Sequence, residues 1–215
     1  MCTCINLKTK DQYFGRNLDL EYRFNEKVVI TPRNYNIKNI DIKYAMIGMA
    51  TVSDNYPLYA EAANEKGLAM AGLYFPNNAY YNEPMKNKIN LANYGQGMRA
   101  IGLPGDNSPA SRFIRVAFNK LNSVCNDDEE SSVTQFFHIL DSVAMTKGSV
   151  ITKENNYDIT TYSSCINTTK GIYYYKTYNN NQITAIKLNN INMNYDKLSI
   201  YELIEKQQIK HINYL

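Results

Sequence analysis

The second residue of the chain combines two groups that can do chemistry together. Cys2 is small and follows Met1, so we expect Met1 to be removed and Cys2 to become the N-terminus. One residue then carries a thiol and a free α-amine, with reference pKa values of about 8.5 and about 7.7–8.0, so both can titrate near neutral pH. The amine can act as the base that activates its own thiol. Such a nucleophile requires no histidine, which suits a chain whose 2 histidines are His138 and His211.

The residues after Cys2 predict what surrounds it. Residues 3–7 alternate polar and apolar side chains and predict a strand, and residues 12–18 predict a second strand that returns after a turn. The hairpin brings Arg16 and Asp19 close to Cys2. A guanidinium favours a neighbouring thiolate, and a carboxylate can hold the α-amine by a hydrogen bond. A second interpretation is that Arg16 and Asp19 form a surface ion pair and Cys2 is a buried small side chain.

Short motifs then follow one another along most of the chain. They are Met-Cys-Thr at residues 1–3, Phe-Gly-Arg-Asn-Leu-Asp at 14–19, Val-Ile-Thr-Pro-Arg at 29–33, Asn-Glu-Lys-Gly-Leu-Ala at 64–69, Ala-Gly-Leu at 71–73, Phe-Pro at 75–76, Gly-Leu-Pro-Gly-Asp at 102–106, Pro-Ala-Ser-Arg-Phe-Ile-Arg-Val-Ala at 109–117, Phe-Phe-His-Ile-Leu at 136–140 and Gly-Ile-Tyr-Tyr-Tyr at 171–175. In this order they resemble the choloylglycine hydrolase family, which contains bile salt hydrolases and penicillin V acylases. The resemblance implies an α+β fold, the αββα sandwich of N-terminal-nucleophile hydrolases, and hydrolysis of a linear amide. The substrate that it implies is a conjugated bile salt.

The resemblance also implies roles for individual residues. Cys2 is the nucleophile, with Arg16 and Asp19 beside it, and Arg112 of the Ser-Arg-Phe motif lies in the catalytic pocket. The alternative for Arg112 is a solvated arginine. A cation in the first turn of a helix opposes the helix dipole, which favours a role elsewhere. The resemblance implies neither a cofactor nor a metal.

Three aromatic residues bear on the substrate. In the family, the loop that contains Tyr22 and Phe24 helps to line the substrate pocket, although both side chains could equally anchor the loop. Tyr74 falls at a position beside the nucleophile, whose backbone N–H is expected in the oxyanion hole. Bile salt hydrolases have Asn at that position and penicillin V acylases have Tyr. Penicillin V acylase activity is therefore the alternative function.

A large segment of the family is missing from the middle of this chain. The resemblance jumps between residues 1–94 and residues 95–215, where the family carries roughly a hundred further residues, the size of a small domain. That segment supplies an Asn that completes the oxyanion hole and a protruding piece used in homo-tetramer assembly. We therefore expect a single, incomplete domain over residues 1–215, with an opened sheet edge and uncovered apolar faces. A non-catalytic remnant is the third function left open.

Periodicity predicts the other elements. Further strands are predicted over residues 27–31, 44–52, 57–63, 68–75, 159–166, 171–178 and 182–188. Residues 108–121 predict a helix that starts with a Ser-Pro cap, and the apolar spacing over residues 133–144 predicts a second helix. Residues 68–73 are apolar on both faces and predict a strand at the centre of the layers. The tail from residue 195 has a weak helical period and the character of a disordered end.

Composition excludes several other classes of protein. A chain of 215 residues with 44% hydrophobic residues is long enough for one domain with a core, and a net charge of +3 gives no basic footprint for nucleic acid. No apolar run is long enough to span a membrane and no signal-peptide pattern is present, so we expect no membrane partner. The 4 cysteines fit neither a zinc site nor a disulfide framework, which indicates a cytoplasmic location.

Overall fold

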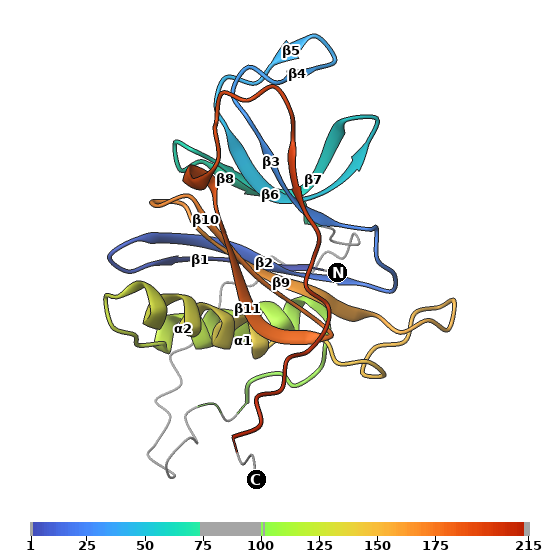
Figure 1. Cartoon of the computed structure of the whole chain (residues 1–215). Helices are drawn as coiled ribbons and strands as arrows, with labels where there is room; N and C mark the ends of the chain where they lie inside the picture. The colour runs from blue at the N-terminus through green and yellow to red at the C-terminus, as the bar shows by residue number, and fades with distance from the viewer. Residues whose placement is uncertain (1, 74–99, 101, 213–215) are drawn as a thin grey trace.

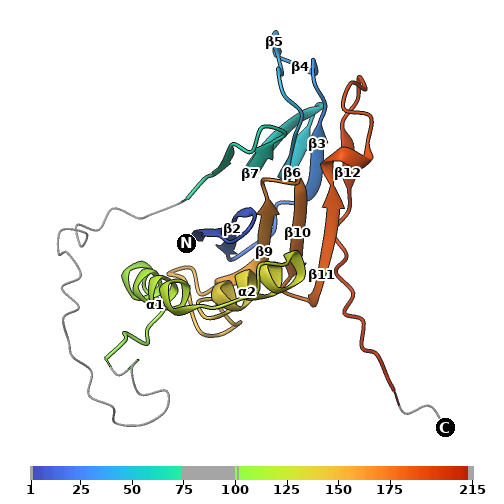
Figure 2. The same cartoon turned by 90° about the vertical axis from the view of Figure 1, so that its left-hand side faces the viewer.

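Two antiparallel sheets lie face to face, and two helices cover the outer face of one of them (Figures 1 and 2). This computed structural model describes residues 2–73, 100 and 102–212. The layers follow the order helix, sheet, sheet. This arrangement confirms the predicted α+β sandwich, and the described residues contain one of the two helical layers of the αββα order.

The sheet next to the helices, called here the first sheet, has the strand order β1-β2-β9-β10-β11. Its strands are β1 (Cys2–Lys8), β2 (Gln12–Leu20), β9 (Ile159–Asn167), β10 (Ile172–Thr177) and β11 (Asn180–Lys187). The predicted opening hairpin and the predicted antiparallel meander over β9, β10 and β11 are both confirmed. Because β2 pairs with β9, strands from the two ends of the chain lie side by side in one sheet.

The second sheet has the strand order β12-β3-β6-β7-β8. Its strands are β3 (Lys27–Thr31), β6 (Met46–Ser53), β7 (Tyr56–Asn64), β8 (Ala69–Ala71) and β12 (Ser199–Tyr201), and a separate hairpin consists of β4 (Asn36–Ile37) and β5 (Ile40–Asp41). The strands predicted over residues 27–31, 44–52 and 57–63 are confirmed within two residues at each end.

The two helices begin at capping side chains. Helix α1 (Pro109–Asn122) starts after Ser108, whose side chain accepts a hydrogen bond from a backbone N–H of the first turn, as the Ser-Pro pattern predicts. Helix α2 (Glu129–Asp141) starts after Asp128, which caps it in the same way, and so it begins four residues before the predicted range. The apolar spacing missed this first turn because its residues are polar. None of the helices among the described residues is long and apolar enough to cross a membrane.

Strand alternation divides the apolar side chains of the first sheet between two cores. On β1 and β2, Ile5, Leu7 and Tyr13 face the helices, whereas Cys2 and Leu18 face the second sheet. The core between the sheets also contains Val28, Ile30, Ile47, Met49, Tyr162, Tyr173 and Tyr175. The alternating tyrosines of β10 are therefore packing residues, as their strand pattern predicts.

Strand β8 corrects one prediction. Residues 68–75 were expected to form a strand at the centre of the layers, but β8 spans three residues and lies at the edge of the second sheet within the described part of the chain. Leu68 is 64% exposed and Met70 is 71% exposed. Exposed apolar side chains on and beside a short edge strand are what the loss of neighbouring strands would leave. The opened edge agrees with the predicted internal deletion.

The C-terminal tail corrects another prediction. The tail from residue 195 was expected to be weakly helical or disordered, but it contains β12, which pairs with β3 at the other edge of the second sheet. Beyond β12, the backbone N–H of Ile204 donates to the Tyr175 hydroxyl at 3.1 Å, and its carbonyl accepts from Asn180 at 3.0 Å. Pairing with a distant strand edge satisfies this backbone, and no local period can reveal such pairing.

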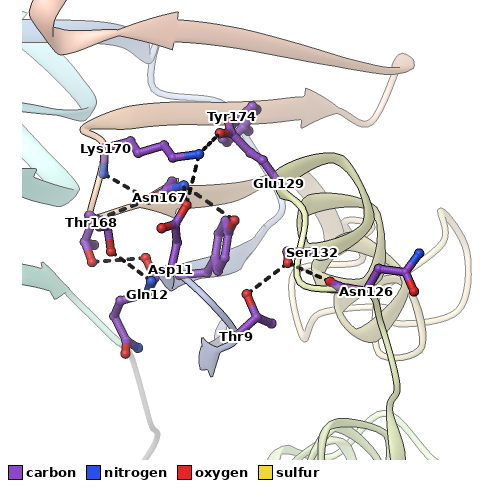
Figure 3. Close-up of polar contacts among 12 residues, drawn as sticks. Thr9, Asp11, Gln12, Asn126, Glu129, Ser132, Asn167, Thr168, Lys170 and Tyr174 are labelled. Carbon is purple, nitrogen blue, oxygen red and sulfur yellow. Dashed lines mark hydrogen bonds and ion pairs between the residues drawn. The ribbon is translucent and has the colours of Figure 1, made fainter.

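A group of charged side chains fastens the start of α2 to two turns of the first sheet (Figure 3). Nζ of Lys170 lies 2.5 Å from Oε2 of Glu129 on α2 and 3.2 Å from Oδ2 of Asp11 in the β1–β2 turn. Asn167 also donates to Asp11 at 2.9 Å, and the Tyr174 hydroxyl donates to Glu129. These contacts join three elements that are far apart in sequence.

Replacing Lys170 with methionine should therefore weaken the protein in a pH-dependent way. Asn167 and Lys170 lower the pKa of Asp11 below 3.8; desolvation raises the pKa of Glu129, but Lys170 and Tyr174 bring it below 4.5. Carboxyl groups with lowered pKa values stabilise the fold above their unfolded pKa, and this stability is lost as the pH falls. The urea midpoint of Lys170→Met should be lower than that of the wild type at pH 7, and the difference should shrink below about pH 4.

The matched control for this variant is Lys187→Met. Lys187 is an exposed lysine on β11 that makes no ion pair with the described residues. Urea unfolding from pH 7 down to pH 3 compares the two variants with the wild type. A difference for Lys170→Met that stays constant with pH would contradict an electrostatic origin.

Candidate active site around Cys2

Cys2 begins β1 and faces the core between the two sheets. It lies opposite Leu18 in the hairpin register, and Cys4 lies opposite Arg16. Because opposite residues and alternate residues share a face, the side chains of Cys2, Cys4, Arg16 and Leu18 all point toward the second sheet. Cys2 is 6% exposed. The hairpin therefore brings a buried thiol and a buried guanidinium together, as the sequence predicts.

Arg16 crosses the space between the sheets. Its Nη1 donates to the main-chain carbonyl of Ala60 at 3.1 Å and to that of Gly72 at 2.6 Å, both in the second sheet. Its Nε and Nη2 are buried and have no hydrogen-bond partner among the described residues. Desolvation lowers the pKa of Arg16, but Tyr162, Glu61 and Cys2 together raise it above its ordinary value. Arg16 is therefore a fixed cation next to Cys2, with two donors that none of the described residues accepts from.

Asp19 lies on the other face of the first sheet, toward the helices. Its Oδ2 is 2.5 Å from Nη1 of Arg112, and its Oδ1 accepts a hydrogen bond from Thr160 at 2.6 Å. Burial raises the pKa of Asp19, and Arg112 acts against this rise. Asp19 directly follows Leu18, the residue opposite Cys2, so its carboxylate lies at the same end of the hairpin as the thiol.

Arg112 reaches the hairpin from the first turn of α1. It is buried, which rules out the alternative of a solvated arginine. Besides its ion pair with Asp19, its Nη1 donates to Thr3 Oγ1 at 3.1 Å and its Nε donates to the Asn107 carbonyl at 3.2 Å. Arg112 thus joins β1 and β2 at the residue next to Cys2. The buried carboxylate of Asp19 explains why a cation occupies the unfavourable end of the helix.

The other cysteines are in different environments. Burial raises the pKa of Cys4 to about 11, although Arg16 lowers it in part, and burial raises the pKa of Cys165 well above its ordinary value. Cys125 is half-buried outside the strands and helices. All four cysteines are free thiols. Cys4 is thus a small filling side chain rather than a second thiolate.

Of the three aromatic residues predicted near the substrate, the structure describes Tyr22 and Phe24. Tyr22 and Phe24 lie in the segment between β2 and β3, are about half exposed, and contact each other edge to face with ring centroids 4.8 Å apart. This position is compatible with both interpretations given above. Tyr74, predicted for the oxyanion site, lies outside the described residues.

One group in this cluster was not predicted. Glu61 on β7 is buried, and its Oε2 lies 3.9 Å from Nη1 of Arg16. The only sequence signal was an acidic residue within a mostly apolar strand, which polar-apolar alternation alone assigns to solvent. Among the described residues, no group of three or more His, Cys, Asp or Glu side chains is placed to hold a metal ion.

The sequence of this chain matches that of a known enzyme family. The sequence model of the family described as "Linear amide C-N hydrolases, choloylglycine hydrolase family" matches residues 2–92 and 82–201. This chain belongs to the choloylglycine hydrolase family. The predicted class, an enzyme that hydrolyses linear amide C–N bonds, is therefore confirmed at the level of the family.

Two curated relatives cover almost the whole chain. A "Bile salt hydrolase/transferase" from Clostridium perfringens (strain 13 / Type A) is 32% identical over 329 residues, with 99% of this chain and 100% of the relative covered. A protein of the same name from Lactiplantibacillus plantarum is 32% identical over 324 residues, with the same coverage. These alignments are much longer than the 215 residues of this chain. A large part of each relative therefore has no counterpart here, as the predicted deletion requires.

Solved structures support the fold. A mutant conjugated bile acid hydrolase from Clostridium perfringens superposes with a TM-score of 0.85 at 30% identity, with 99% of this chain and 100% of that chain covered. A penicillin V acylase from Agrobacterium tumefaciens gives a TM-score of 0.66 at 11% identity, with 94% and 91% covered, and shares the fold alone. The αββα fold of N-terminal-nucleophile hydrolases is thus confirmed, in the shortened form described above.

Proposed function

We propose that this chain hydrolyses the amide bond that joins a bile acid to glycine or taurine. Relatives named bile salt hydrolase/transferase, 32% identical over nearly the whole chain, support this substrate class. The observation that carries the proposal is the buried Cys2 beside Arg16, whose Nε and Nη2 have no hydrogen-bond partner among the described residues. Buried donors without partners are suited to a thiolate.

In the proposed reaction, Met1 has been removed and Cys2 is the N-terminal residue. The Cys2 thiolate attacks the amide carbonyl, a C–S bond forms, and the carbonyl oxygen takes up the electron pair. The α-ammonium group of Cys2 then gives a proton to the leaving nitrogen as the C–N bond breaks, and glycine or taurine departs from a thioester. The α-amine next takes a proton from water, the water oxygen attacks the thioester, and the bile acid leaves as the thiolate re-forms.

The neighbouring side chains have distinct roles in this proposal. Arg16, on the side-chain face of Cys2, stabilises the thiolate. Asp19, on the opposite face, holds the α-amine, because the main-chain nitrogen of a strand lies in the plane of the sheet between the two faces. Arg112 keeps Asp19 ionised and in place. The oxyanion is bound by the backbone N–H of Tyr74.

The substrate body lies outside this catalytic group. We assign the aromatic pair of Tyr22 and Phe24 to one wall of the substrate site, because two half-exposed rings can cover an apolar steroid. The residue at position 74 favours a second candidate function. Tyr74 is typical of penicillin V acylases, so hydrolysis of a phenoxyacetyl amide is the alternative.

With this function we also infer the domain organisation, the class of partner and the cellular location of the chain. The two parts of the chain, residues 1–94 and 95–215, act as a single domain, because β2 pairs with β9 and β3 pairs with β12. The partner is a small-molecule amide rather than nucleic acid, and the location is cytoplasmic. The family forms homo-tetramers partly through the missing segment, so we do not extend tetramer assembly to this chain.

Paired hydrolysis assays test the function. Protein whose intact mass shows removal of Met1 is incubated with taurocholate, glycocholate and penicillin V, and the released amine is measured. We expect kcat/KM for the two bile salts to exceed that for penicillin V by at least about tenfold, a ratio that pocket contacts readily supply. The reverse order would favour the penicillin V acylase, and hydrolysis of none of the three would identify a non-catalytic remnant.

A further inference from the structure

A carboxylate from the second sheet is buried between the sheets next to Arg16. Glu61 on β7 is 1% exposed. Its Oε2 accepts a hydrogen bond from the Tyr162 hydroxyl at 2.6 Å, and its Oε1 accepts one from the Tyr173 hydroxyl at 2.5 Å. Its Oε2 also lies 3.9 Å from Nη1 of Arg16. Glu61 therefore belongs to the same buried cluster as Cys2, although its strand is not part of the hairpin.

Main-chain groups, rather than Glu61, determine where Arg16 lies. Nη1 donates to the carbonyls of Ala60 and Gly72, which carry no net charge. The positive charge of the guanidinium must then be balanced by an anion, because an uncompensated buried charge is strongly unfavourable. Two groups in the cluster can supply that anion. They are the carboxylate of Glu61 and the thiolate of Cys2.

The groups around Glu61 have opposing effects on the pKa of its carboxyl group. Desolvation raises the pKa of Glu61, while Arg16 and the two tyrosine hydroxyls act against this rise. Desolvation and the nearby Glu61 raise the pKa values of Tyr162 and Tyr173 well above their ordinary range, so both phenols remain neutral donors. The negative charge near Arg16 therefore depends on Glu61 and Cys2 alone among the described groups of this cluster.

We propose that Glu61 is a positioning residue that acts on the Cys2 nucleophile through Arg16. The Glu61 carboxylate and the Cys2 thiolate compete for electrostatic stabilisation by the Arg16 guanidinium. This role rests on the proposed function, in which Cys2 attacks as a thiolate. While Glu61 is ionised, its interaction with the guanidinium weakens the electrostatic stabilisation that Arg16 gives to the thiolate. Once Cys2 is acylated, the thiolate is absent, and of the described side chains Glu61 alone balances the charge of the buried guanidinium.

In the described part of the chain, few other titratable side chains near Cys2 can affect its thiol at neutral pH. Among the described residues, the titratable and charged side chains that face the space around Cys2 come from β1, β2, β7, β9 and β10, and they are Cys4, Arg16, Glu61, Tyr162 and Tyr173. Asp19 and Arg112 lie on the opposite face of the sheet. The α-amine of Cys2 also titrates near neutral pH, but it is the same in every variant. Because the pKa of Cys4 is about 11 and both phenols stay neutral, differences between variants in the Cys2 thiol report on Arg16 and Glu61.

The test measures how fast iodoacetamide alkylates Cys2 between pH 5 and pH 9, using peptide mass spectrometry. Glu61→Gln keeps the size of the side chain and removes its charge, so more of the Arg16 charge stabilises the thiolate. We expect the alkylation profile to move to lower pH, with the rate at pH 6 about three- to tenfold higher than in the wild type. A purely structural role for Glu61 would lower stability without moving this profile.

Glu65→Gln is the matched control. Glu65 follows the end of β7 and pairs with Arg33 and the Ala45 N–H, away from the cluster. Its substitution makes the same chemical change directly after the same strand, and the alkylation profile of Cys2 should equal that of the wild type. An unchanged profile in folded Glu61→Gln, or a shift to higher pH, overturns the role of Glu61.

A second variant covers the case in which Glu61→Gln does not fold. Tyr173→Phe removes one hydrogen bond from the carboxylate and leaves Arg16 untouched, so Glu61 is neutral over a wider pH range. The profile should again move to lower pH, with alkylation at pH 6 about two- to threefold faster. A profile identical to the wild type overturns the role.

Alkylation needs no amide substrate, so the two proposals can fail separately. If the profile shifts as expected but no amide is hydrolysed, the proposed function fails and the electrostatic coupling stands. If bile salts are hydrolysed but the profile does not move, the role of Glu61 fails and the proposed function stands.

Discussion

Replacement of Cys2 with alanine is expected to reduce bile salt hydrolysis by about 10⁴-fold or more in kcat/KM. The reason is that no other thiol in the described chain can take over the attack. Burial raises the pKa of Cys4 to about 11, and Cys165 is buried with its pKa raised well above its ordinary value. Both are therefore protonated near neutral pH, and a thiol is a far weaker nucleophile than a thiolate.

The control for this variant is Cys125→Ser. Cys125 lies between α1 and α2, half-buried and outside the catalytic group. Its substitution should leave kcat/KM within about twofold of the wild type, as for surface changes away from a site. The measurement is release of taurine from taurocholate by each variant, with circular dichroism to show that the fold is kept. Substantial hydrolysis by folded Cys2→Ala would remove Cys2 from the mechanism.

Arg112→Met is expected to lower the free energy of unfolding by about 3–5 kcal/mol, the typical effect of removing one partner of a buried ion pair. Arg112 and Asp19 have almost no exposure, and the ion pair joins α1 to β2. Without the guanidinium, burial raises the pKa of Asp19 further. A carboxyl with a raised folded pKa destabilises the fold as the pH rises through the range between its two pKa values. The loss should therefore be smaller at pH 5 than at pH 7.

A double variant separates this effect from simple loss of packing. Adding Asp19→Asn to Arg112→Met removes the buried charge, so more than half of the lost stability should return. Lys27→Ala provides the control, because it breaks an ion pair with the exposed Glu202 and should cost less than about 1 kcal/mol. Urea unfolding at pH 5 and pH 7 measures all of these variants. Equal stability of the single and double variants would contradict the charge-based account.

The opening hairpin was predictable because its information is local. Alternation over residues 3–7 and 12–18 defines which side chains share a face, and a short turn determines which residues lie opposite each other. The register places Cys2 opposite Leu18 and Cys4 opposite Arg16. The start of α1 was predictable for the same reason, since Ser108 and Pro109 act on the backbone next to them.

The surroundings of the hairpin were less accessible to sequence reasoning. Arg112 was placed at the site only through the family resemblance, and its contact with Asp19 joins residues separated by 93 positions. Glu61 was missed, because a single acidic residue in a strand carries no local sign that tyrosines from another sheet will surround it. The strand over residues 68–75 was placed wrongly at the centre of the layers, and the pairing of β12 with β3 was not predicted.

The sequence alone thus determined the nucleophile candidate, the hairpin that carries it and the neighbouring Arg16 and Asp19, since each depends on residues that are close along the chain. The tertiary structure alone decided that Arg16 and Asp19 lie on opposite faces of the sheet, that Glu61 is buried 3.9 Å from Arg16 and that β8 lies at an edge of the second sheet within the described residues. These outcomes depend on how sheets and helices stack. Stacking brings together residues about a hundred positions apart, and burial then makes their few polar contacts decisive.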